Sequence, residues 1–598
     1  MPGELYDLTL VAGRGIVIGQ CSAPPHALTE RLTNTLRTGD TRPLMSLPGA
    51  YSAVLVTVSG LTLVADSVGQ FPIYYRRTQG EFVFGTRAEL VAANASFDLV
   101  ALAAEIACPQ AFSALGTRTN YSGVHQLLPG TALRISTSGT QLTVPSASLI
   151  PDTRQSLNQA ADELHEVLQA AVIARAPQSA DFSGGFDSTS LAFLAARLVP
   201  RLTAVTVSQR GAPVDDDLRA AAALARLDRR LTHRVAHGDE HHLPYQHPIP
   251  GADAPHPAVL HRGPLALRLS NVAESGSAVH LVGEGGDQVL TAPHAYLADL
   301  ARRGAHGELW RHCVAWARLR HRSPTALFVR SMRLAAMTSS QELRALARQL
   351  DPRQTHNDSW EHRAITVAGH LLCRWLMPRT RVALAAQLSS PVDDQHLDVG
   401  DQAAIAQLRS ACRAQHIVRE FAAAHGIAVH APFLDPEVAR VCMSVPAWRR
   451  ADPQSVKPLL RRAMASLVPD AVFTRTTKGN YTATAHLGVR HSIRSLHALL
   501  ADPLTAELGL IEPGPVRDVV NRAARGIAVP WAALNQVLAV EIWLRDATTR
   551  GRDGTVDAGV HRPRRSEHHH ERERAGGGPQ HPNRPMAHIE RDRRHDLP

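Results

Sequence analysis

Two patterns of hydrophobic and polar positions divide the chain. Residues 1–145 hold short runs rich in Val, Tyr and Phe, such as AYSAVLVTVSG and EFVFGT, separated by turns that contain glycine. This pattern predicts β-strands. From Leu157 onwards the pattern of apolar and polar residues changes, and SLNQAADELHEVLQAAVIARA carries apolar residues at helical spacing.

Short strands and helices alternate in the second part. LTAVTVS (202–208) and AVHLV (278–282) are apolar runs typical of buried parallel strands, and LRAAAALARL between them has a helical pattern. Such strand–helix–strand alternation predicts a doubly wound α/β domain. The segment 300–410 is almost continuously helical in pattern.

These patterns predict three regions. A chain of 598 residues is too long for one core, so we expect a β-rich domain over 1–145 and an α/β domain over 155–550. The Ser- and Pro-rich stretch near 136–152 is predicted to link them. Residues 551–598, rich in His and Arg and without apolar periodicity, are predicted to be a disordered tail.

Composition narrows the class of protein. The chain is 44% hydrophobic and 20% charged, and no apolar run approaches the length of a membrane helix. No secretory signal is visible, and six cysteines without CxxC spacing favour a reducing cytoplasm. The net charge of +10 suggests nucleic acid, but the arginines are spread along the whole chain without interleaved aromatic residues. We therefore expect a cytoplasmic protein that binds neither membrane nor nucleic acid.

The stretch DFSGGFDSTSLA (181–192) predicts a phosphate-binding turn between a strand and a helix. Gly184 and Gly185 let backbone N–H groups approach an anion, and Ser183 and Ser188 offer hydroxyl groups to it. Asp187 beside a phosphate requires a cation, which indicates Mg²⁺. The alternative is a plain capped helix start, but capping does not call for SGG before DS.

SGGFDS matches in full the SGGxDS signature of the N-type ATP pyrophosphatases, whose pyrophosphate loop it resembles. Enzymes with this loop split ATP between the α and β phosphates, adenylate an oxygen nucleophile and release pyrophosphate. The resemblance implies ATP and Mg²⁺ as cofactors. The nucleotide-binding residues that it implies in this part of the chain are Phe182, Ser183, Gly184, Gly185, Asp187, Ser188, Val207 and Gly283.

A second motif, GEGGDQ (283–288), resembles the G-E-G-x-D-E stretch of asparagine synthetases. Carried over by position, Glu284 becomes the catalytic carboxylate and Asp287 shares the metal with Asp187. Both acids follow predicted strand ends, the edge where open α/β sheets bind ligands. Two carboxylates can share a divalent cation where they could not share empty space.

Two later segments extend the resemblance over residues 155–550. HAPFLDPEVARVCMSVP (430–446) resembles the R-x-PFLD segment of asparagine synthetases, with His430 in place of Arg. The segment 456–481 resembles their lysine-containing end, which makes Lys478 a catalytic cation on the α-phosphate and pyrophosphate. Arg475 and Lys457 are either nucleotide contacts or surface charges. The fold implied is a synthetase domain like the adenine-nucleotide α-hydrolases.

The β-rich domain, with ADSVGQFPIYY and FVFGTRAELVAA, resembles the glutaminase domain of the same family, an Ntn-type sandwich. Active glutaminases use a processed N-terminal cysteine as nucleophile and base. Here Met1 is followed by Pro2 and Gly3, and Cys21 is expected to be a small buried residue. We expect a domain that keeps its shape and has lost amidase chemistry, so another amine must attack the acyl-adenylate.

Three families fit an inactive glutaminase domain. β-Lactam synthetases place a tyrosine where this chain has Glu284, and an ammonia-dependent asparagine synthetase would keep Glu284. Lasso-peptide macrolactam cyclases lack the N-terminal cysteine and combine the SGGxDS loop, a GEGGD-like turn and the lysine-containing loop, so we favour this family. They would join the N-terminal amine of a precursor peptide to an Asp or Glu side chain. The segment 300–410 then either walls a peptide-sized cavity or merely supports the sheet.

The lasso resemblance also implies partners: the precursor peptide as substrate, a leader-peptide-binding protein and a cysteine protease that removes the leader. A non-enzymatic alternative is a scaffold protein with a fossil synthetase domain. The joint presence of Asp187, Asp287 and Lys478 argues against it.

Overall fold

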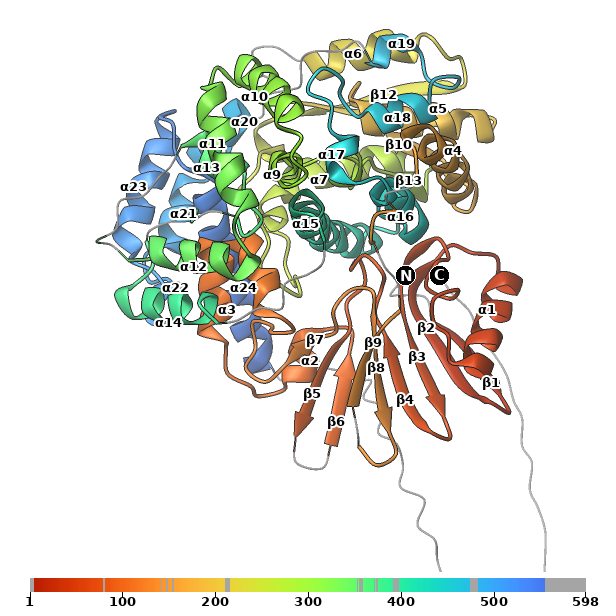
Figure 1. Ribbon diagram of the computed structural model, residues 1–598, viewed down its shortest axis with the longest axis horizontal. Helices are drawn as coiled ribbons and strands as arrows, with labels where there is room; N and C mark the ends of the chain where they lie inside the picture. Colours follow the sequence, from red (N-terminus) through yellow and green to blue (C-terminus); the bar gives the residue numbers. More distant parts are fainter. Residues whose placement is uncertain are drawn as a thin grey trace, which may run out of the picture. The chain divides into compact units, whose positions relative to one another are not determined.

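The computed structural model describes residues 5–553, apart from residues 79–80, 140, 147–148, 153–154, 210–215, 352, 354–358, 370, 373–374, 391–396 and 474–481. All the described residues belong to one compact unit, residues 1–555. Figure 1 shows an N-terminal part built from sheets, followed by a much more helical part.

The N-terminal part contains two antiparallel sheets (Figure 1). The larger has the strand order β1-β2-β3-β4-β8-β9 and the smaller the order β6-β5-β7. The strands are β1 (Leu5–Leu10), β2 (Gly13–Cys21), β3 (Gly49–Thr57), β4 (Gly60–Val64), β5 (Tyr74–Thr78), β6 (Glu81–Gly85), β7 (His125–Gln126), β8 (Thr131–Ser136) and β9 (Gln141–Pro145). The predicted β-rich character of this region is confirmed.

Two sequence expectations fail within these sheets. The linker predicted over 136–152 contains β9, which pairs antiparallel with β8 along its whole length. A tight turn between Ser136 and Gly139 lets the chain reverse, and the alternation in QLTV suits a pleated edge strand. Cys21, the last residue of β2, is half-buried and not enclosed, although it packs against the core that α1 covers.

Helices of the N-terminal part cover the sheets or join the second part. They are α1 (Pro25–Thr38), α2 (Ala88–Ala92), α3 (Leu99–Ala107) and the 3₁₀ helix η1 (Pro109–Leu115). Helix α1 buries Leu28, Leu32 and Leu36 at four-residue spacing, which is one face of a helix. Helix α3 is apolar on nearly all sides, and it packs against α14 (Pro378–Leu388) and α24 (Trp531–Asp553) of the second part.

The second part is built on a five-stranded parallel sheet with the order β12-β11-β10-β13-β14. Its strands are β10 (Ser179–Asp181), β11 (Leu202–Gln209), β12 (Leu231–Gly238), β13 (Val279–Leu281) and β14 (Ala428–His430). From β10 the chain adds β11 and β12 on one side, then β13 and β14 on the other. The predicted parallel strands at 202–208 and 278–282 are confirmed, and the direction of winding changes between β10 and β13.

Helices connect these strands. They are α4 (Leu157–Ile173), α5 (Phe186–Leu198), α6 (Asp216–Ala225) and α7 (Arg262–Glu274), with the 3₁₀ helices η2 (Glu240–His242), η3 (Pro257–His261) and η4 (Pro432–Leu434). Helix α4 starts at a capping box, in which Ser156 and Gln159 satisfy each other's backbone N–H groups. The helix predicted from Leu157 is therefore confirmed at its first residue.

The remaining helices follow β13 and pack around the sheet. They are α8 (Gly286–Leu290), α9 (Tyr296–Arg302), α10 (His306–Arg320), α11 (Pro324–Ala335), α12 (Ser339–Gln349), α13 (Trp360–Ala364), α14 (Pro378–Leu388), α15 (Val399–Ala423), α16 (Pro436–Ser444), α17 (Ala447–Arg450), α18 (Pro458–Ala463), α19 (Asp470–Phe473), α20 (Thr482–His491), α21 (Ile493–Leu499), α22 (Leu504–Glu507), α23 (Pro513–Ala524) and α24 (Trp531–Asp553). Helices α9 to α15 confirm the helical character predicted for 300–410.

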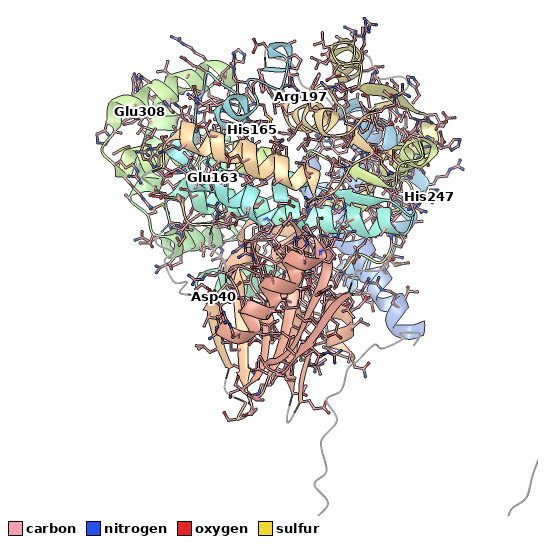
Figure 2. All side chains as sticks on the ribbon, turned by 90° about the vertical axis from the view of Figure 1, so that its right-hand side faces the viewer. Asp40, Glu163, His165, Arg197, His247 and Glu308 are labelled. Atoms are coloured by element: carbon pink, nitrogen blue, oxygen red, sulfur yellow. The ribbon has the colours of Figure 1, made fainter. Side chains whose placement is uncertain are left out.

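Helix α4 contacts later segments of the chain, and Figure 2 labels two of the residues concerned, Glu163 and His165. Glu163 on α4 forms an ion pair with Arg440 at 2.6 Å, and the His165 ring hydrogen-bonds the carbonyl oxygen of Ala463 at 3.0 Å. From α5, Arg197 donates to the carbonyl oxygen of Leu467 at 3.2 Å. These contacts hold α16 and α18 against α4.

Two predictions about the ends and the environment of the chain can be compared with this fold. Helix α24 continues to Asp553, so the first residues of the predicted 551–598 tail are helical. Residues 554–598 lie outside the described residues. Among the described helices, none is both long enough and apolar enough to span a membrane.

Candidate functional site

The candidate site lies at the carboxyl ends of β10 and β13, where the winding of the sheet changes direction. Open α/β sheets bind ligands at such a switch point, because two loops diverge there and leave a crevice. The loop after β10 carries SGGFDS and the loop after β13 carries GEGGDQ. The two motifs, about a hundred residues apart in the sequence, are therefore neighbours in the fold.

The loop after β10 has the backbone geometry of an anion cradle. Gly184 adopts a φ of +72°, and a Cβ there would lie 2.7 Å from the Cβ of Ala220. The Ser183 and Ser188 hydroxyl groups lie 2.9 Å apart, and the Gly185 N–H group donates to the Ser183 hydroxyl. Helix α5 begins at once, so its free N–H groups face the same place.

The loop after β13 packs directly on the first loop. A Cβ on Gly283 would lie 2.7 Å from the Ser188 nitrogen, and one on Gly286 would lie 2.4 Å from the Asp187 Cγ. Gly285 adopts a φ of +90° at the start of α8. Glycines in GEGGDQ therefore allow the two loops to touch backbone to backbone.

Asp187 and Asp287 meet at one cation, the ammonium group of Lys457. Lys457 Nζ lies 2.7 Å from Asp287 Oδ1 and forms a short ion pair with Asp187 Oδ2. The Lys457 side chain is only 4% exposed, whereas that of Asp287 is 55% exposed. Lys457 is thus not a surface charge, which was one of the two alternatives left open by the sequence.

This donor set fits magnesium. Mg²⁺ is usually held by one or two carboxylates together with water and substrate phosphates, so a large protein cage is not required. Asp187 and Asp287 supply two such carboxylates beside the predicted phosphate cradle. The described residues contain no cluster of three or more acidic, histidine or cysteine ligands.

Glu284 stands between these acids and a separate ion-pair network. Burial, followed by the nearby charge of Asp287, raises the pKa of the Glu284 carboxyl group, although its side chain reaches solvent. Arg268 opposes this rise, and it forms an ion pair with Asp181 at 3.1 Å. A carboxyl group with a raised pKa at the mouth of a crevice is suited to proton transfer.

The other residues predicted to contact the nucleotide lie within the sheet or outside the described residues. The Phe182 ring is fully buried beside Phe193, and its backbone N–H group donates to Val205 within the sheet. Val207 lies near the end of β11 and is half-buried, opposite Ala236 of β12. Arg475 and Lys478 lie outside the described residues, so their predicted roles stay predictions.

The HAPFLD segment holds the base of the site. Arg175 and Asp435 form a buried bidentate ion pair, with Nη1 2.8 Å from Oδ2. From the N-terminal part, the Gln70 side chain donates to the Leu434 carbonyl oxygen at 2.9 Å. Burial lowers the pKa of His430 far below its usual range, which keeps its imidazole neutral. The Gln70 contact joins the loop at 66–72 of the N-terminal part to the second part.

Comparison with known proteins agrees with this geometry. Residues 159–545 match the model of the family described as asparagine synthase, and this range contains both loops, Lys457 and the HAPFLD segment. The chain belongs to the asparagine synthase family. Membership implies ATP-dependent amide ligation in general terms, and it confirms the family resemblance seen in the motifs.

Curated relatives of this family member include proteins from Mycobacterium bovis and from two strains of Mycobacterium tuberculosis, CDC 1551 and H37Rv. Each is named "Putative asparagine synthetase (glutamine-hydrolyzing)" and is 27% identical over 389 residues. The match covers 60% of this chain and 55% of each relative. The chain therefore spans about half the length of the curated relatives that it matches.

The motifs alone left the role of Lys457 open, although the composition of the chain sets this residue apart. This member of the asparagine synthase family has only two lysines, Lys457 and Lys478, among 64 basic Lys and Arg residues. A compact ammonium group fits between two carboxylates where a planar guanidinium would not.

Proposed function

We propose that this protein adenylates a carboxylate with ATP, releases pyrophosphate, and then forms an amide with loss of AMP. The observation that carries this proposal is the meeting of the SGGFDS and GEGGDQ loops, with Asp187 and Asp287 joined through Lys457. A P-loop for γ-phosphate transfer would need a GxxxxGKS or GxxxxGKT sequence, which the chain lacks.

In this proposal the two loops divide the work. The backbone N–H groups and hydroxyls of residues 183–188 bind the pyrophosphate, while Asp187 and Asp287 hold Mg²⁺. The ion supplies charge neutralisation for the phosphates when bound. Lys457 keeps both carboxylates oriented, and Lys478 is proposed to stabilise charge as the α–β bond breaks.

Glu284 is proposed to act in the second half-reaction. The attacking amine must lose a proton when its nitrogen bonds to the acyl carbon and AMP leaves. A carboxylate with a raised pKa can accept that proton near neutral pH. The Arg268–Asp181 pair lies close enough to influence the protonation of Glu284.

We further propose that the substrate is a lasso precursor peptide, whose N-terminal amine is joined to an Asp or Glu side chain. Glu284 stands where β-lactam synthetases carry tyrosine, which disfavours that class. The proposed partners are a leader-peptide-binding protein and a leader protease, and the proposed location is the cytoplasm. The N-terminal part would be an Ntn-type domain without amidase activity, and the second part would be an adenine-nucleotide α-hydrolase-like domain.

A second candidate is an asparagine synthetase, which the printed names of the curated relatives favour. In that case the carboxylate would be free aspartate, and ammonia would replace the peptide amine. Both candidates need the same adenylation site. They differ in the size of the acyl donor and in the amine.

The decisive experiment incubates the full chain with ATP, MgCl₂ and precursor peptides that have a free N-terminal amine and an internal Asp or Glu. We expect AMP, pyrophosphate and a peptide lighter by one water in mass spectrometry, with no product from Asp287→Ala. Asparagine made from aspartate and ammonia, without peptide dehydration, would select the second candidate. Formation of ADP and phosphate would overturn the adenylation proposal itself.

A further inference from the structure

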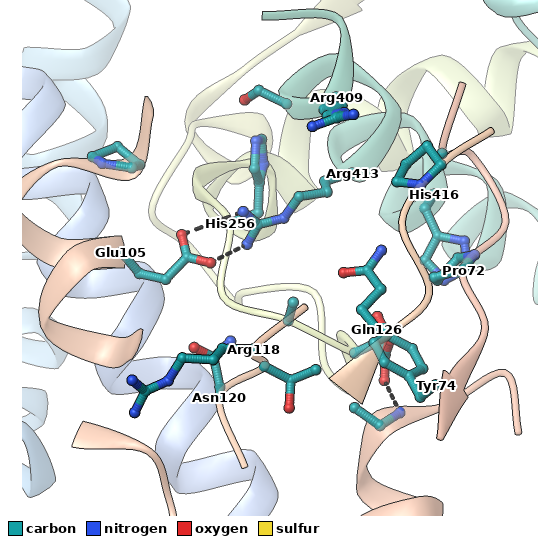
Figure 3. A pocket seen from close by; sticks show the side chains of 18 of the residues that line it. Pro72, Tyr74, Glu105, Arg118, Asn120, Gln126, His256, Arg409, Arg413 and His416 are labelled. Atoms are coloured by element: carbon teal, nitrogen blue, oxygen red, sulfur yellow. Dashed lines mark hydrogen bonds and ion pairs between the residues drawn. The ribbon is translucent and has the colours of Figure 1, made fainter. Parts of the chain in front are cut away.

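A cavity of about 140 Å³ lies between the N-terminal part and helices α15 and α24 (Figure 3). Its described lining includes Tyr74 of β5 and Glu105 of α3 on one side, and Arg409 and Arg413 of α15 on the other. No residue of the SGGFDS or GEGGDQ loop is among that lining. The cavity is therefore distinct from the adenylation site.

One cation in this cavity has no counter-charge. Arg413 forms an ion pair with Glu105 at 2.6 Å and donates to the carbonyl oxygen of Pro255 at 3.0 Å. Arg409, one helical turn earlier, makes no hydrogen bond or ion pair with any described residue. Burial lowers the pKa of the Arg409 guanidinium group. Arg409 is half-buried, and an anion would stabilise a guanidinium group that has lost part of its hydration and has no counter-charge.

Two amide groups in the same cavity also lack partners. Asn120 Oδ1 and Gln536 Oε1 are buried without a hydrogen bond inside the described structure, and the Asn120 residue is 5% exposed. Buried amide oxygens are nearly always hydrogen-bonded. Exchanging the oxygen and nitrogen of either amide would still leave a polar group that needs a partner.

The remaining titratable groups do not fill these vacancies. Burial lowers the pKa of His256 and of His416 to about 3, so neither ring adds positive charge. Asp253 accepts a hydrogen bond from the Ala88 N–H group at 2.9 Å, and burial raises its pKa to about 6. The unmet needs are thus an anion for Arg409, polar partners for two amide oxygens, and a donor for Asp253 Oδ2, which is also buried without a hydrogen bond in the described structure.

We propose that this cavity binds a free α-amino acid or dipeptide through its carboxylate and its N–H groups. The carboxylate pairs with Arg409, and the N–H donors meet the amide oxygens of Asn120 and Gln536. Figure 3 shows Arg409 and Asn120 on opposite sides of the Glu105–Arg413 pair, so a ligand with groups at both ends suits the cavity better than a simple anion. Apolar residues such as Leu128 and Ile417 complete the lining.

The test is calorimetric titration of the full chain, without ATP, using L-glutamine, L-leucine and glycyl-L-leucine up to about 10 mM. We expect saturable binding of at least one probe, and the dipeptide shows whether one or two residues fit. The corresponding amide without a carboxylate, such as L-leucinamide, should bind at least about tenfold more weakly, since it cannot pair with Arg409. Because ATP is omitted, the outcome is independent of the adenylation proposal.

Arg409→Gln should weaken binding by about tenfold or more. The exposed Arg318 on α10 offers the matched control Arg318→Gln, which should bind like the original protein. Absence of binding by all three probes, or equal affinity for a probe and its amide, would overturn the proposal. Unchanged affinity in a folded Arg409→Gln protein would do the same. If that variant fails to fold, the difference in affinity between L-leucine and L-leucinamide for the original protein still tests the proposal.

Discussion

The two parts of this protein each place an aspartate and glycine in a loop after a strand, and they use the aspartate in opposite ways. In the N-terminal part, the Asp66 carboxylate accepts hydrogen bonds from the backbone N–H groups of Val68, Gly69 and Gln70 at 2.7–3.2 Å. It is 1% exposed, and burial raises its pKa to about 6. The hydrogen-bonding capacity of the Asp66 carboxylate is therefore used within its own loop and is not available to a ligand.

In the second part, the aspartates face outward from their own loops. Asp187 and Asp287 are held by Lys457, which comes from a segment 270 residues after Asp187. Such a carboxylate keeps lone pairs directed at the crevice, where a metal and phosphates can use them. A carboxylate satisfied by its own backbone maintains structure, and one held by a distant cation is available for chemistry.

The largest expected effect comes from the acids of the second part. Asp187→Ala and Asp287→Ala should each lower ATP–pyrophosphate exchange by more than about 10²-fold, since either change removes a predicted metal ligand. The measurement is exchange of labelled pyrophosphate in the presence of whichever acyl donor supports exchange in the unmodified protein. Near-normal exchange in either folded variant would remove the shared-metal assignment.

Lys457→Met should lower the same exchange by about 10²-fold, because two carboxylates would then face each other without the ammonium group. Lys457→Arg should not restore the rate, since the planar guanidinium does not fit the gap. Arg461→Met, at an exposed position on α18, is the control and should exchange normally. Full activity of Lys457→Arg would contradict the role given to shape.

Glu284→Gln should separate the two half-reactions. Amide formation should fall by about 10²-fold, whereas pyrophosphate exchange should persist better, because the general base acts only on the amine. In the unmodified protein the raised pKa of Glu284 means that this carboxylate becomes protonated at a higher pH than an ordinary glutamate. As pH falls, amide formation should therefore decline at a higher pH than it would with an unshifted glutamate. The measurement is the rate of each half-reaction against pH. Equal loss of both half-reactions would remove the amine-directed role.

Gly286→Ala should reduce exchange by roughly tenfold, since its Cβ would lie 2.4 Å from the Asp187 Cγ and push the loops apart. Gly307→Ala on α10 meets open space and serves as the matched control. Both variants are compared by exchange rate and melting temperature. Equal rates would show that the loops can separate at no functional cost.

The smallest effect on chemistry is expected at Asp66. Asp66→Asn should lower the free energy of unfolding by about 1–3 kcal/mol. The Asp66 carboxylate accepts a hydrogen bond from the Tyr51 N–H group, whereas the amide N–H₂ of asparagine would place a second donor opposite that group. Exchange per folded molecule should not change. Denaturant unfolding and the exchange assay measure the two quantities. A large loss of exchange with unchanged stability would erase the contrast between the two loops.

Glutamine hydrolysis depends on neither loop and is tested directly. If the N-terminal part lacks amidase chemistry, added glutamine should release no glutamate, and Cys21→Ala should leave amide formation unchanged. Glutamate release in proportion to protein concentration would contradict this expectation.

Local chemistry was readable from the sequence wherever a motif is contiguous. SGGFDS and GEGGDQ specify their own turns, because glycine conformations and helix starts depend on neighbouring residues. Their juxtaposition followed from the alternation of strands and helices, since parallel strands bring their carboxyl ends to one edge. The β9 strand was missed because serine and proline near a turn look alike in a linker and a hairpin.

By itself, then, the sequence determined the two loops, the parallel sheet beneath them and the membership of a ligase family. Only the tertiary structure decided which charges find partners. Lys457 is buried between two acids from distant segments, whereas Arg409 is half-buried and has no acidic partner among the described residues. Pairing of a buried charge depends on what the fold brings opposite it, and that is a property of packing across the whole chain.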